Sequence, residues 1–190
     1  MATQTPVIQT ARLVLRPLTL ADAPDVYAYA RDPEVAAFTS WQPHASVADA
    51  ETYIQFELAR YAAGKVASWA LEDRASGRVI GGAGYVQESA ANRRAEIGYV
   101  LARAAWGQGL MTEAVEAVLA HAFVTLGLHR VEAYCKVENL ASARVMAKCG
   151  MQPEGVLRAY VWKDGRPRDV LMHSILAPAW RARTAEEPVP

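Results

Sequence analysis

Two features of the sequence carry residue types suited to chemistry: a glycine turn before a helix and a glutamate on an apolar strand. Gly107 and Gly109 flank Gln108 just before Leu110, where an apolar stripe of helical spacing begins. Residues without side chains let a phosphate approach the backbone, and the first amides of a helix offer it unpaired donors. From the turn alone, a simple packing turn and a phosphate seat both remain open.

The best-known phosphate motifs do not fit this turn. A P-loop is excluded because no Gly-Lys-Ser/Thr sequence follows. In the dinucleotide-binding motif the glycines follow a strand directly, whereas "ARAAW" separates the strand "EIGYVL" from Gly107, and Thr112 replaces the third small residue. A dinucleotide-dependent oxidoreductase is therefore a weak third alternative. A second cluster, "IGGAGY" from Ile80, precedes no helix and predicts a bulge or a close approach within a strand.

Glu96 is the carboxylate placed to accept a proton. It lies in "RRAEIGYVL", which is apolar enough for a central strand, and shares a face with Gly98. Burial there raises the pKa of a carboxyl group toward values useful in proton transfer. The alternative is a strand-edge carboxylate paired with Arg93 or Arg94.

The composition favours one globular domain in the cytoplasm. The chain has 190 residues, 52% hydrophobic and 21% charged, and its 20 basic and 20 acidic side chains balance. A neutral chain lacks the basic excess of a nucleic-acid binder. We see neither a signal peptide nor an apolar run near the ~18 residues of a membrane span, so no membrane partner is expected. Cys135, Cys149 and the four histidines lack metal-ligand spacing, so we expect no metal.

Hydrophobic periodicity predicts the elements that must position these residues. In chain order we expect a strand at 12–18, helices near 20–30 and 47–61, a hairpin of strands at 68–73 and 79–88, a strand at 93–101, a helix at 110–126, a strand at 130–137, a helix between Asn139 and Gly150, and a hairpin at 155–176 that turns at Asp164-Gly165. The segment 31–44 is expected to be irregular.

This order of elements predicts an α+β fold with α/β/α layers. Consecutive hairpins with inserted helices indicate a mixed, mainly antiparallel central sheet flanked by about four helices. We assign one domain to residues 1–176 and a flexible C-terminal tail to residues 177–190, where the periodicity is lost.

The run from residue 95 to residue 155 resembles the GNAT superfamily of acyl-CoA-dependent N-acyltransferases, and within it the Rim-type ribosomal-protein N-acetyltransferases. The resemblance rests on the motifs WGxGxxTEA, Asn-x-x-Ser and "KCGM…EG" at matching spacing. It implies a sheet whose two central strands, at 96–101 and 130–137, splay apart, with acetyl-CoA bound between them.

The same resemblance implies which residues bind acetyl-CoA. The family's pyrophosphate loop, Gln/Arg-x-x-Gly-x-Gly/Ala, matches residues 104–109, although Ala104 replaces the Gln or Arg. Phosphate binding then rests on backbone amides of the turn, while pantetheine binds strand backbone and lies beside an Asn and a Ser. The expected contacts are Val100, Leu101, Gly107, Gln108, Gly109, Leu110, Met111, Asn139 and Ser142.

Acetyl transfer to an amine needs a proton acceptor for the amine and a stabilised thiolate. Glu96 falls where the resemblance places the catalytic glutamate. Ser142 matches the residue that faces the thiol and is the candidate acid, with Tyr134 and Tyr160 as alternatives.

Four other aromatic residues divide into two expectations. Trp41 and Tyr85 are candidates for lining an acceptor cleft, whereas Trp69 and Trp106 are expected in the core.

The sequence therefore predicts an acetyl-CoA-dependent N-acetyltransferase that works by direct attack in a ternary complex. A protein N-terminal α-amine is the favoured acceptor. The alternatives are a small-molecule acceptor (a polyamine, amino acid or antibiotic amine) and a non-catalytic acyl-CoA-binding domain. We expect a monomer or a homodimer.

Overall fold

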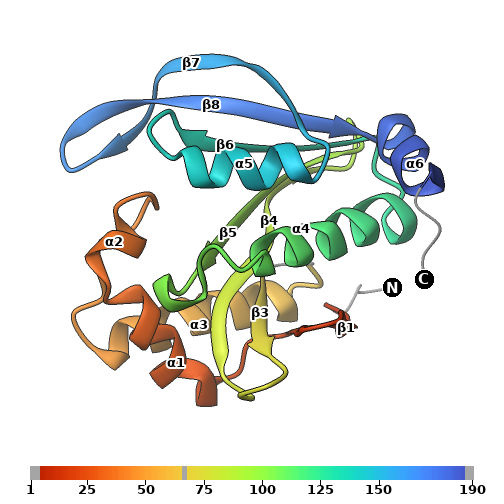
Figure 1. The fold of residues 1–190 in the computed structure, drawn as a ribbon. Helices are drawn as coiled ribbons and strands as arrows, with labels where there is room; N and C mark the ends of the chain where they lie inside the picture. The colour runs from red at the N-terminus through yellow and green to blue at the C-terminus, as the bar shows by residue number, and fades with distance from the viewer. Residues whose placement is uncertain (1–4, 66–67, 187–190) are drawn as a thin grey trace. The chain divides into compact units, whose positions relative to one another are not determined.

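The computed structural model describes residues 5–65 and 68–186 of the chain. Its elements are β1 (Ile8–Gln9), β2 (Leu13–Arg16), the 3-10 helix η1 (Leu20–Asp22), α1 (Ala23–Ala30), α2 (Pro33–Ala36), α3 (Val47–Ala62), β3 (Ser68–Asp73), β4 (Val79–Ser89), β5 (Arg94–Leu101), the 3-10 helix η2 (Arg103–Ala105), α4 (Leu110–Ala120), the π-helix η3 (His121–Thr125), β6 (Arg130–Lys136), α5 (Leu140–Lys148), β7 (Gln152–Lys163), β8 (Arg166–Leu176) and α6 (Ala177–Glu186). The strands follow one another in the order β1-β2-β3-β4-β5-β6-β8-β7, which confirms the mixed, mainly antiparallel sheet (Figure 1).

Two compact units make up this chain. Unit 1 comprises Met1–Val86 and Gly98–Ala117, and unit 2 comprises Gln87–Ile97 and Val118–Pro190. The chain passes from one unit to the other within β4, within β5 and within α4. The assignment of residues 1–176 to one domain stays a prediction.

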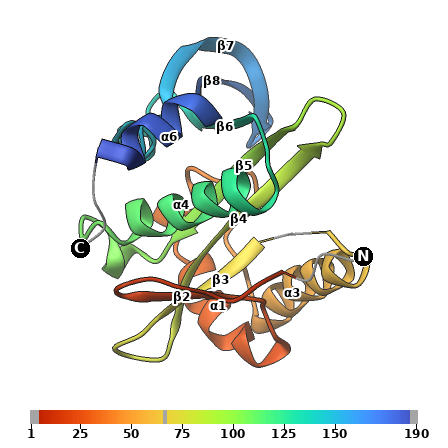
Figure 2. The ribbon, with the colours of Figure 1, turned by 90° about the vertical axis from the view of Figure 1, so that its right-hand side faces the viewer.

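Unit 1 packs helices α1 and α3 against its antiparallel strands (Figure 2). Three consecutive residues of β3, Trp69, Ala70 and Leu71, are fully buried, so both faces of this strand are covered. The core on the helical side joins α1, α3 and the strands through Leu18, Ala23, Val26, Tyr29, Ala30, Val35, Ala50, Ile54, Ala70 and Val79.

Local sequence chemistry sets the starts of these helices. Thr19 and Asp22 form a capping box: the Thr19 amide donates to Asp22 Oδ2 at 2.7 Å. Ser46 and Asp49 form a second box before α3, with the Ser46 amide donating to Asp49 Oδ2 at 2.9 Å.

The glycine cluster of β4 forms the predicted bulge. Leu71 of β3 pairs with Gly81 and Glu72 pairs with Val79, so Ile80 is the extra residue of the ladder.

Unit 2 contains the parallel part of the sheet and a long hairpin. Strand β5 pairs in parallel with β6 over residues 94–96, β6 pairs with β8, and β8 pairs with β7. Asp164 and Gly165 turn the hairpin with φ angles of 54° and 69°, as a two-residue turn with positive φ requires. Helix α5 contacts β6 and β7, and α6 contacts β8.

Three expectations about these elements are wrong. Residues 33–36 lie in the region expected to be irregular, but they form α2. This helix starts at Pro33, and Asp32 is its N-cap: the Asp32 Oδ1 accepts from the Glu34 amide at 2.9 Å. Residues 177–186 form α6 rather than an irregular tail; its Trp180 packs on Phe123 at 5.4 Å, a contact that its sequence periodicity does not reveal. Residues 187–190 lie outside the described part.

Trp106 is the third correction, because 41% of it is exposed rather than buried in the core. Across residues 5–65 and 68–186, no helix combines the length and apolar character needed to cross a bilayer.

Candidate active site

The glycine turn of unit 1 presents an exposed backbone at the start of α4. Gly107 and Gly109 have φ angles of 74° and 78°, which residues with a Cβ adopt only at a cost. The first backbone bond of α4 joins the Glu113 amide to the Gly109 carbonyl at 3.1 Å. Leu110 and Met111 precede that bond, so their amides belong to the first turn of α4 and have no acceptor within the helix. In other proteins the amides of a first helical turn commonly bind anions. The turn fits a phosphate group through its backbone.

The end of β5, also in unit 1, orients the backbone of the two residues predicted to bind pantetheine. A Cβ on Gly81 would lie 2.3 Å from the Val100 carbonyl oxygen, so glycine is required and this carbonyl faces β4. A trans peptide directs its C=O and N–H to opposite sides, so the Leu101 amide points away from β4. The Leu101 carbonyl accepts from the Trp106 indole Nε1 at 2.8 Å. Leu101 therefore offers its amide on the side away from β4, whereas Val100 turns its carbonyl to β4.

Glu96 lies in unit 2, beside a second glutamate. The parallel register pairs Glu96 of β5 with Glu132 of β6, on strands that run about 4.8 Å apart. Burial and the charge of Glu132 raise the pKa of Glu96, while Arg94 acts in the opposite direction. Both glutamates line a small hollow of about 40 Å³ with Arg94 and the end of β4. A half-buried carboxyl group with a raised pKa has the properties of a general base.

Two arginines form ion pairs with Glu132. Arg94 Nη1 forms an ion pair with Glu132 Oε1, and Arg130 Nε donates to Glu132 Oε2 at 2.7 Å. The sequence alternative pairs Arg93 or Arg94 with Glu96; in the structure Arg93 Nη2 donates to the Gly127 carbonyl at 2.6 Å, and Arg94 forms its ion pair with Glu132.

The network continues from Arg130 to a second carboxylate. Arg130 Nη1 donates to Glu154 Oε1 at 2.7 Å, and Ser174 Oγ donates to the same oxygen at 2.6 Å. These bonds lower the pKa of Glu154 to about 2. The sequence did not indicate that Glu132, Arg130 and Glu154 form a group. A glutamate in the middle of a strand, two residues after Arg130, was the available signal, but Arg94 and Glu154 come from distant segments.

Tyr134 is the tyrosine that interacts with Glu96. Burial, Glu96 and Tyr160 all raise its pKa, and its ring packs edge to face on Tyr160 with 5.4 Å between centroids. A phenol in this state stays protonated and can donate a hydrogen bond.

Asn139 and Ser142 are brought together by the start of α5. The Asn139 side-chain oxygen accepts from the Ser142 amide at 3.1 Å, which confirms Asn139 as the N-cap. The Ser142 hydroxyl hydrogen-bonds the thiol of Cys135, whose pKa is raised by burial. Ser142 is therefore held against β6, and its role toward a thioester stays a prediction.

The aromatic candidates for an acceptor cleft have different surroundings. Tyr85 is fully buried and packs on Trp69 at 5.7 Å, so its placement in an open cleft is wrong: it belongs to the core of unit 1. Trp41 is half-buried, 5.4 Å from the His44 ring, and packs on the same unit's core.

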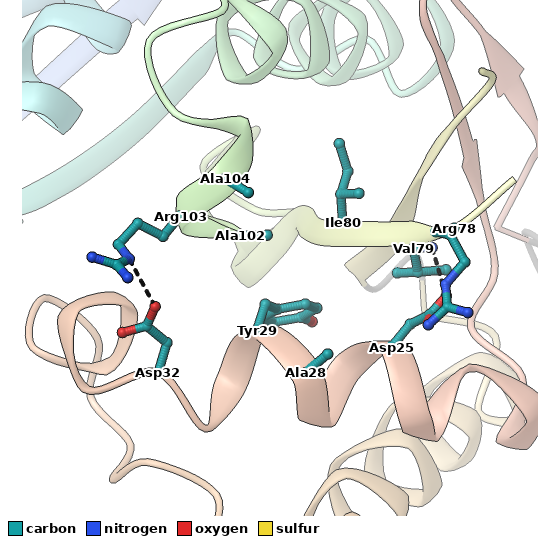
Figure 3. Close-up of a pocket in the computed structure, with 10 residues that line it drawn as sticks. All are labelled: Asp25, Ala28, Tyr29, Asp32, Arg78, Val79, Ile80, Ala102, Arg103 and Ala104. Atoms are coloured by element: carbon teal, nitrogen blue, oxygen red, sulfur yellow. Dashed lines mark hydrogen bonds and ion pairs between the residues drawn. The ribbon is translucent and has the colours of Figure 1, made fainter. Parts of the chain in front are cut away.

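A hollow in unit 1 is lined by none of the predicted site residues. It has a volume of about 380 Å³, with Tyr29 on its α1 side and Ile80 on its β4 side (Figure 3). Two ion pairs span it, Arg103 with Asp32 at 3.1 Å and Arg78 with Asp25. Its arginines are thus already paired with carboxylates.

Among the described residues, no group of three or more His, Cys, Asp or Glu side chains could hold a metal ion. Glu96 and Tyr134 of unit 2 are titratable groups with raised pKa values, and unit 1 presents the backbone of its glycine turn.

Comparison with known proteins identifies the family. The model of the "Acetyltransferase (GNAT) domain" family matches residues 12–152. The Bacillus subtilis (strain 168) protein named "Uncharacterized N-acetyltransferase YoaA" is 35% identical over 173 residues, which cover 91% of this chain and 98% of that protein. The Escherichia coli (strain K12) "[Ribosomal protein uS5]-alanine N-acetyltransferase" is 31% identical over 84 residues, 44% of this chain and 43% of that protein.

A solved structure shares the fold. The acetyltransferase (GNAT family) from Bacillus anthracis superposes with a TM-score of 0.82 at 23% identity, and the match covers 91% of this chain and 99% of that one. The predicted resemblance and the predicted enzyme class, an acetyl-CoA-dependent N-acetyltransferase, are confirmed. The chain belongs to the GNAT family of acetyltransferases.

Proposed function

We propose that the protein transfers the acetyl group of acetyl-CoA to a protein N-terminal α-amine, by direct attack in a ternary complex. The observation that carries the proposal is Glu96, a half-buried carboxyl group whose pKa is raised by burial and by its neighbour Glu132. Such a group accepts a proton from an amine that would otherwise stay charged.

The step requires one bond to form and one to break. The amine nitrogen attacks the thioester carbon, a C–N bond forms, and the C–S bond breaks. Glu96 takes the proton from the nitrogen, directly or through a water, and the departing thiolate gains a proton or a hydrogen bond from a hydroxyl group. Ser142 is the acid expected from the family motif, and Tyr134 is the second candidate because it interacts with Glu96.

Binding of the pyrophosphate and of the pantetheine chain is assigned to the backbone of unit 1. The positive φ angles of Gly107 and Gly109 and the first-turn amides of Leu110 and Met111 support binding of the CoA pyrophosphate. The Leu101 amide, which points away from β4, supports a backbone bond to pantetheine. Asn139 and Ser142 are assigned to the region of the sulfur.

The acceptor class follows from the strength of the base. An α-amine has a pKa of about 8, against about 10.4 for a lysine side chain. At neutral pH the free energy needed to deprotonate an α-amine is therefore smaller, and a carboxylate base suffices more easily. The match to an enzyme named for a ribosomal-protein alanine supports the same class.

A thiol-release screen with acetyl-CoA tests the acceptor. One peptide carries a free N-terminus and an acetylated lysine, and its matched partner carries an acetylated N-terminus and a free lysine; polyamines, amino acids and aminoglycosides form the third arm. We expect release with the free N-terminus alone. Turnover only with small amines would replace the acceptor class, and CoA binding without turnover on any amine would favour the non-catalytic alternative.

The two candidate acids are separated by paired variants. If Ser142 protonates the thiolate, S142A lowers kcat by about tenfold or more and Y134F does not, since general acid catalysis contributes roughly 10²–10⁴-fold. The reverse pattern assigns the role to Tyr134. The measurement is kcat at saturating acetyl-CoA for both variants.

A further inference from the structure

Arg12 occupies a position beside the glycine turn that the family motif does not account for. It precedes β2 in unit 1, almost a hundred residues before the turn, and its side chain is half exposed. Its Nη1 donates to the Gln108 carbonyl at 2.8 Å, and its Nη2 lies 3.6 Å from where a Cβ on Gly109 would stand. The guanidinium therefore touches the middle of the turn from outside.

Glu113 fixes the guanidinium in that place. Arg12 Nε donates to Glu113 Oε2 at 2.7 Å, and the Arg12 amide donates to Glu113 Oε1 at 2.7 Å. Thr10 Oγ1 donates to the same Oε1 at 2.6 Å. Burial alone would raise the pKa of Glu113, but the bonds from Thr10 and Arg12 outweigh it and hold the pKa below its ordinary value. Glu113 therefore stays a carboxylate at neutral pH and keeps Arg12 oriented.

The bond from Arg12 to the Gln108 carbonyl sets the direction of the Gly109 amide. The Gln108 carbonyl and the Gly109 amide share one trans peptide, so they point to opposite sides. Because Arg12 holds the carbonyl on its own side, the Gly109 amide is directed to the other side of the turn. The Gln108 side chain closes the loop by donating from Nε2 to the Ala104 carbonyl at 2.9 Å.

The bond between Arg12 and the turn matters because of the residue at position 104, which is alanine. This is the motif position where the family pattern has Gln or Arg, and alanine supplies neither a charge nor a side-chain donor.

We propose that Arg12, held by Glu113, is the positioning residue of the CoA pyrophosphate turn and takes over the part that Ala104 cannot play. The inference rests on the proposed use of acetyl-CoA. It makes Arg12 specific for the pyrophosphate part of the donor and leaves the acetyl-pantetheine part unaffected.

The test uses two donors with the full-length protein. Acetyl-CoA carries the pyrophosphate, and S-acetylpantetheine lacks it. For R12Q we expect the KM for acetyl-CoA to rise about tenfold with kcat unchanged, since tenfold corresponds to ~1.4 kcal/mol, and kcat/KM for S-acetylpantetheine to stay at the wild-type value. Equal losses with both donors, or no loss with acetyl-CoA, would overturn the proposal.

Arg74 provides a matched control. Its Nη1 donates to the Thr10 carbonyl at 2.8 Å, so R74Q disturbs the same β1–β2 turn without removing the bond to Gln108. R74Q should leave the KM for acetyl-CoA unchanged. R12K should recover only part of the affinity, because an ammonium cannot serve Glu113 and Gln108 together as a guanidinium does. Full recovery by R12K would show that charge alone matters and would overturn the positioning role.

Calorimetric binding of free CoA and of pantetheine separates this inference from the proposed function. If the wild-type protein binds CoA but acetylates no amine, the proposed function fails. A selective loss of CoA affinity in R12Q would still support Arg12. If R12Q binds both ligands as the wild type does, Arg12 fails and the proposed function is untouched.

Discussion

The two units of the chain offer different kinds of groups to the reaction. Unit 1 presents backbone: a turn of glycines with φ angles of 74° and 78°, and the first amides of α4. Unit 2 presents side chains that titrate, led by Glu96 and Tyr134, each with a raised pKa. A phosphate keeps its charge through the reaction, so fixed dipoles suffice to hold it, whereas an amine must lose a proton to a group whose pKa is tuned.

The difference predicts opposite responses to substitution. Changes in unit 1 should act on the affinity for the donor and spare the chemical step. Changes in the Glu96 network should act on turnover and on its pH dependence and spare donor affinity. Variants that mix the two effects would break the distinction.

The largest effect is expected at Glu96. E96Q keeps the shape of the side chain and removes its ability to accept a proton, so kcat should fall by about 10²-fold or more, the usual contribution of general base catalysis. The measurement is the pH–rate profile with the accepted amine. E51Q, on the exposed surface of α3, is the control and should behave as the wild type. Unchanged turnover in E96Q would remove Glu96 as the base.

Gly109 carries the next largest effect, and it should appear in KM. Alanine at a φ of 78° costs roughly 1–2 kcal/mol, so the free turn of G109A relaxes and binding must restore it. The KM for acetyl-CoA should rise about fivefold to thirtyfold at unchanged kcat.

Gly77 is the matched control for that strain. Its φ is 68°, no atom lies within 4 Å of a Cβ built on it, and it turns the β3–β4 hairpin. G77A should lower thermal stability as G109A does but leave the KM for acetyl-CoA alone. If the KM for acetyl-CoA rose equally in G77A and G109A, lost stability rather than a damaged phosphate-binding turn would explain the effect.

The features of unit 1 were predictable because they depend on local conformation. A Gly-x-Gly sequence before a helical stripe marks a turn with positive φ, and Gly81 in "IGGAGY" marks a strand that another backbone approaches. The Asn139 cap and the Asp164-Gly165 turn of unit 2 were predictable for the same reason. Each depends on a few neighbouring residues.

Features that depend on distant pairs were not predictable from one sequence. Nothing near Glu132 indicates that Arg94 binds it, and nothing near Gln108 indicates Arg12. Tyr85 failed for the same reason, because its burial on Trp69 arises from the pairing of β3 with β4. Residue types and their spacing indicate which groups can react, whereas the contacts that tune those groups exist only in the folded chain.

The tuning of Glu96 can be tested in both directions. The acidic limb of the kcat/KM profile follows the pKa of Glu96, since only its deprotonated form accepts a proton. R94Q removes a positive charge, so this pKa should rise and the limb should move to higher pH. E132Q removes a negative charge, so the limb should move to lower pH, with an effect on the plateau smaller than that of E96Q.

Opposite shifts distinguish electrostatic tuning from damage to the fold. Loss of a buried ion-pair partner in E132Q destabilises the protein, so R94Q, which changes the more exposed partner, keeps the test decisive if E132Q does not fold. Shifts of the same sign, or a fixed limb in R94Q, would contradict a role for this network in the proton transfer.

Glu154 supplies the smallest effect and shows whether the network also stabilises unit 2. Its pKa is lowered from 4.5 to about 2, chiefly by Arg130 and then by Ser174. A lowered pKa in the folded protein contributes stability that is fully present above about 4.5 and is lost as the pH falls toward 2. Because 42% of the side chain is exposed, solvent screening keeps the contribution below about 1 kcal/mol. Urea unfolding of wild type and E154Q should therefore differ at pH 6 and converge near pH 2.5. A difference that stays constant with pH would mean that the carboxylate packs in the network without being stabilised there as a charge.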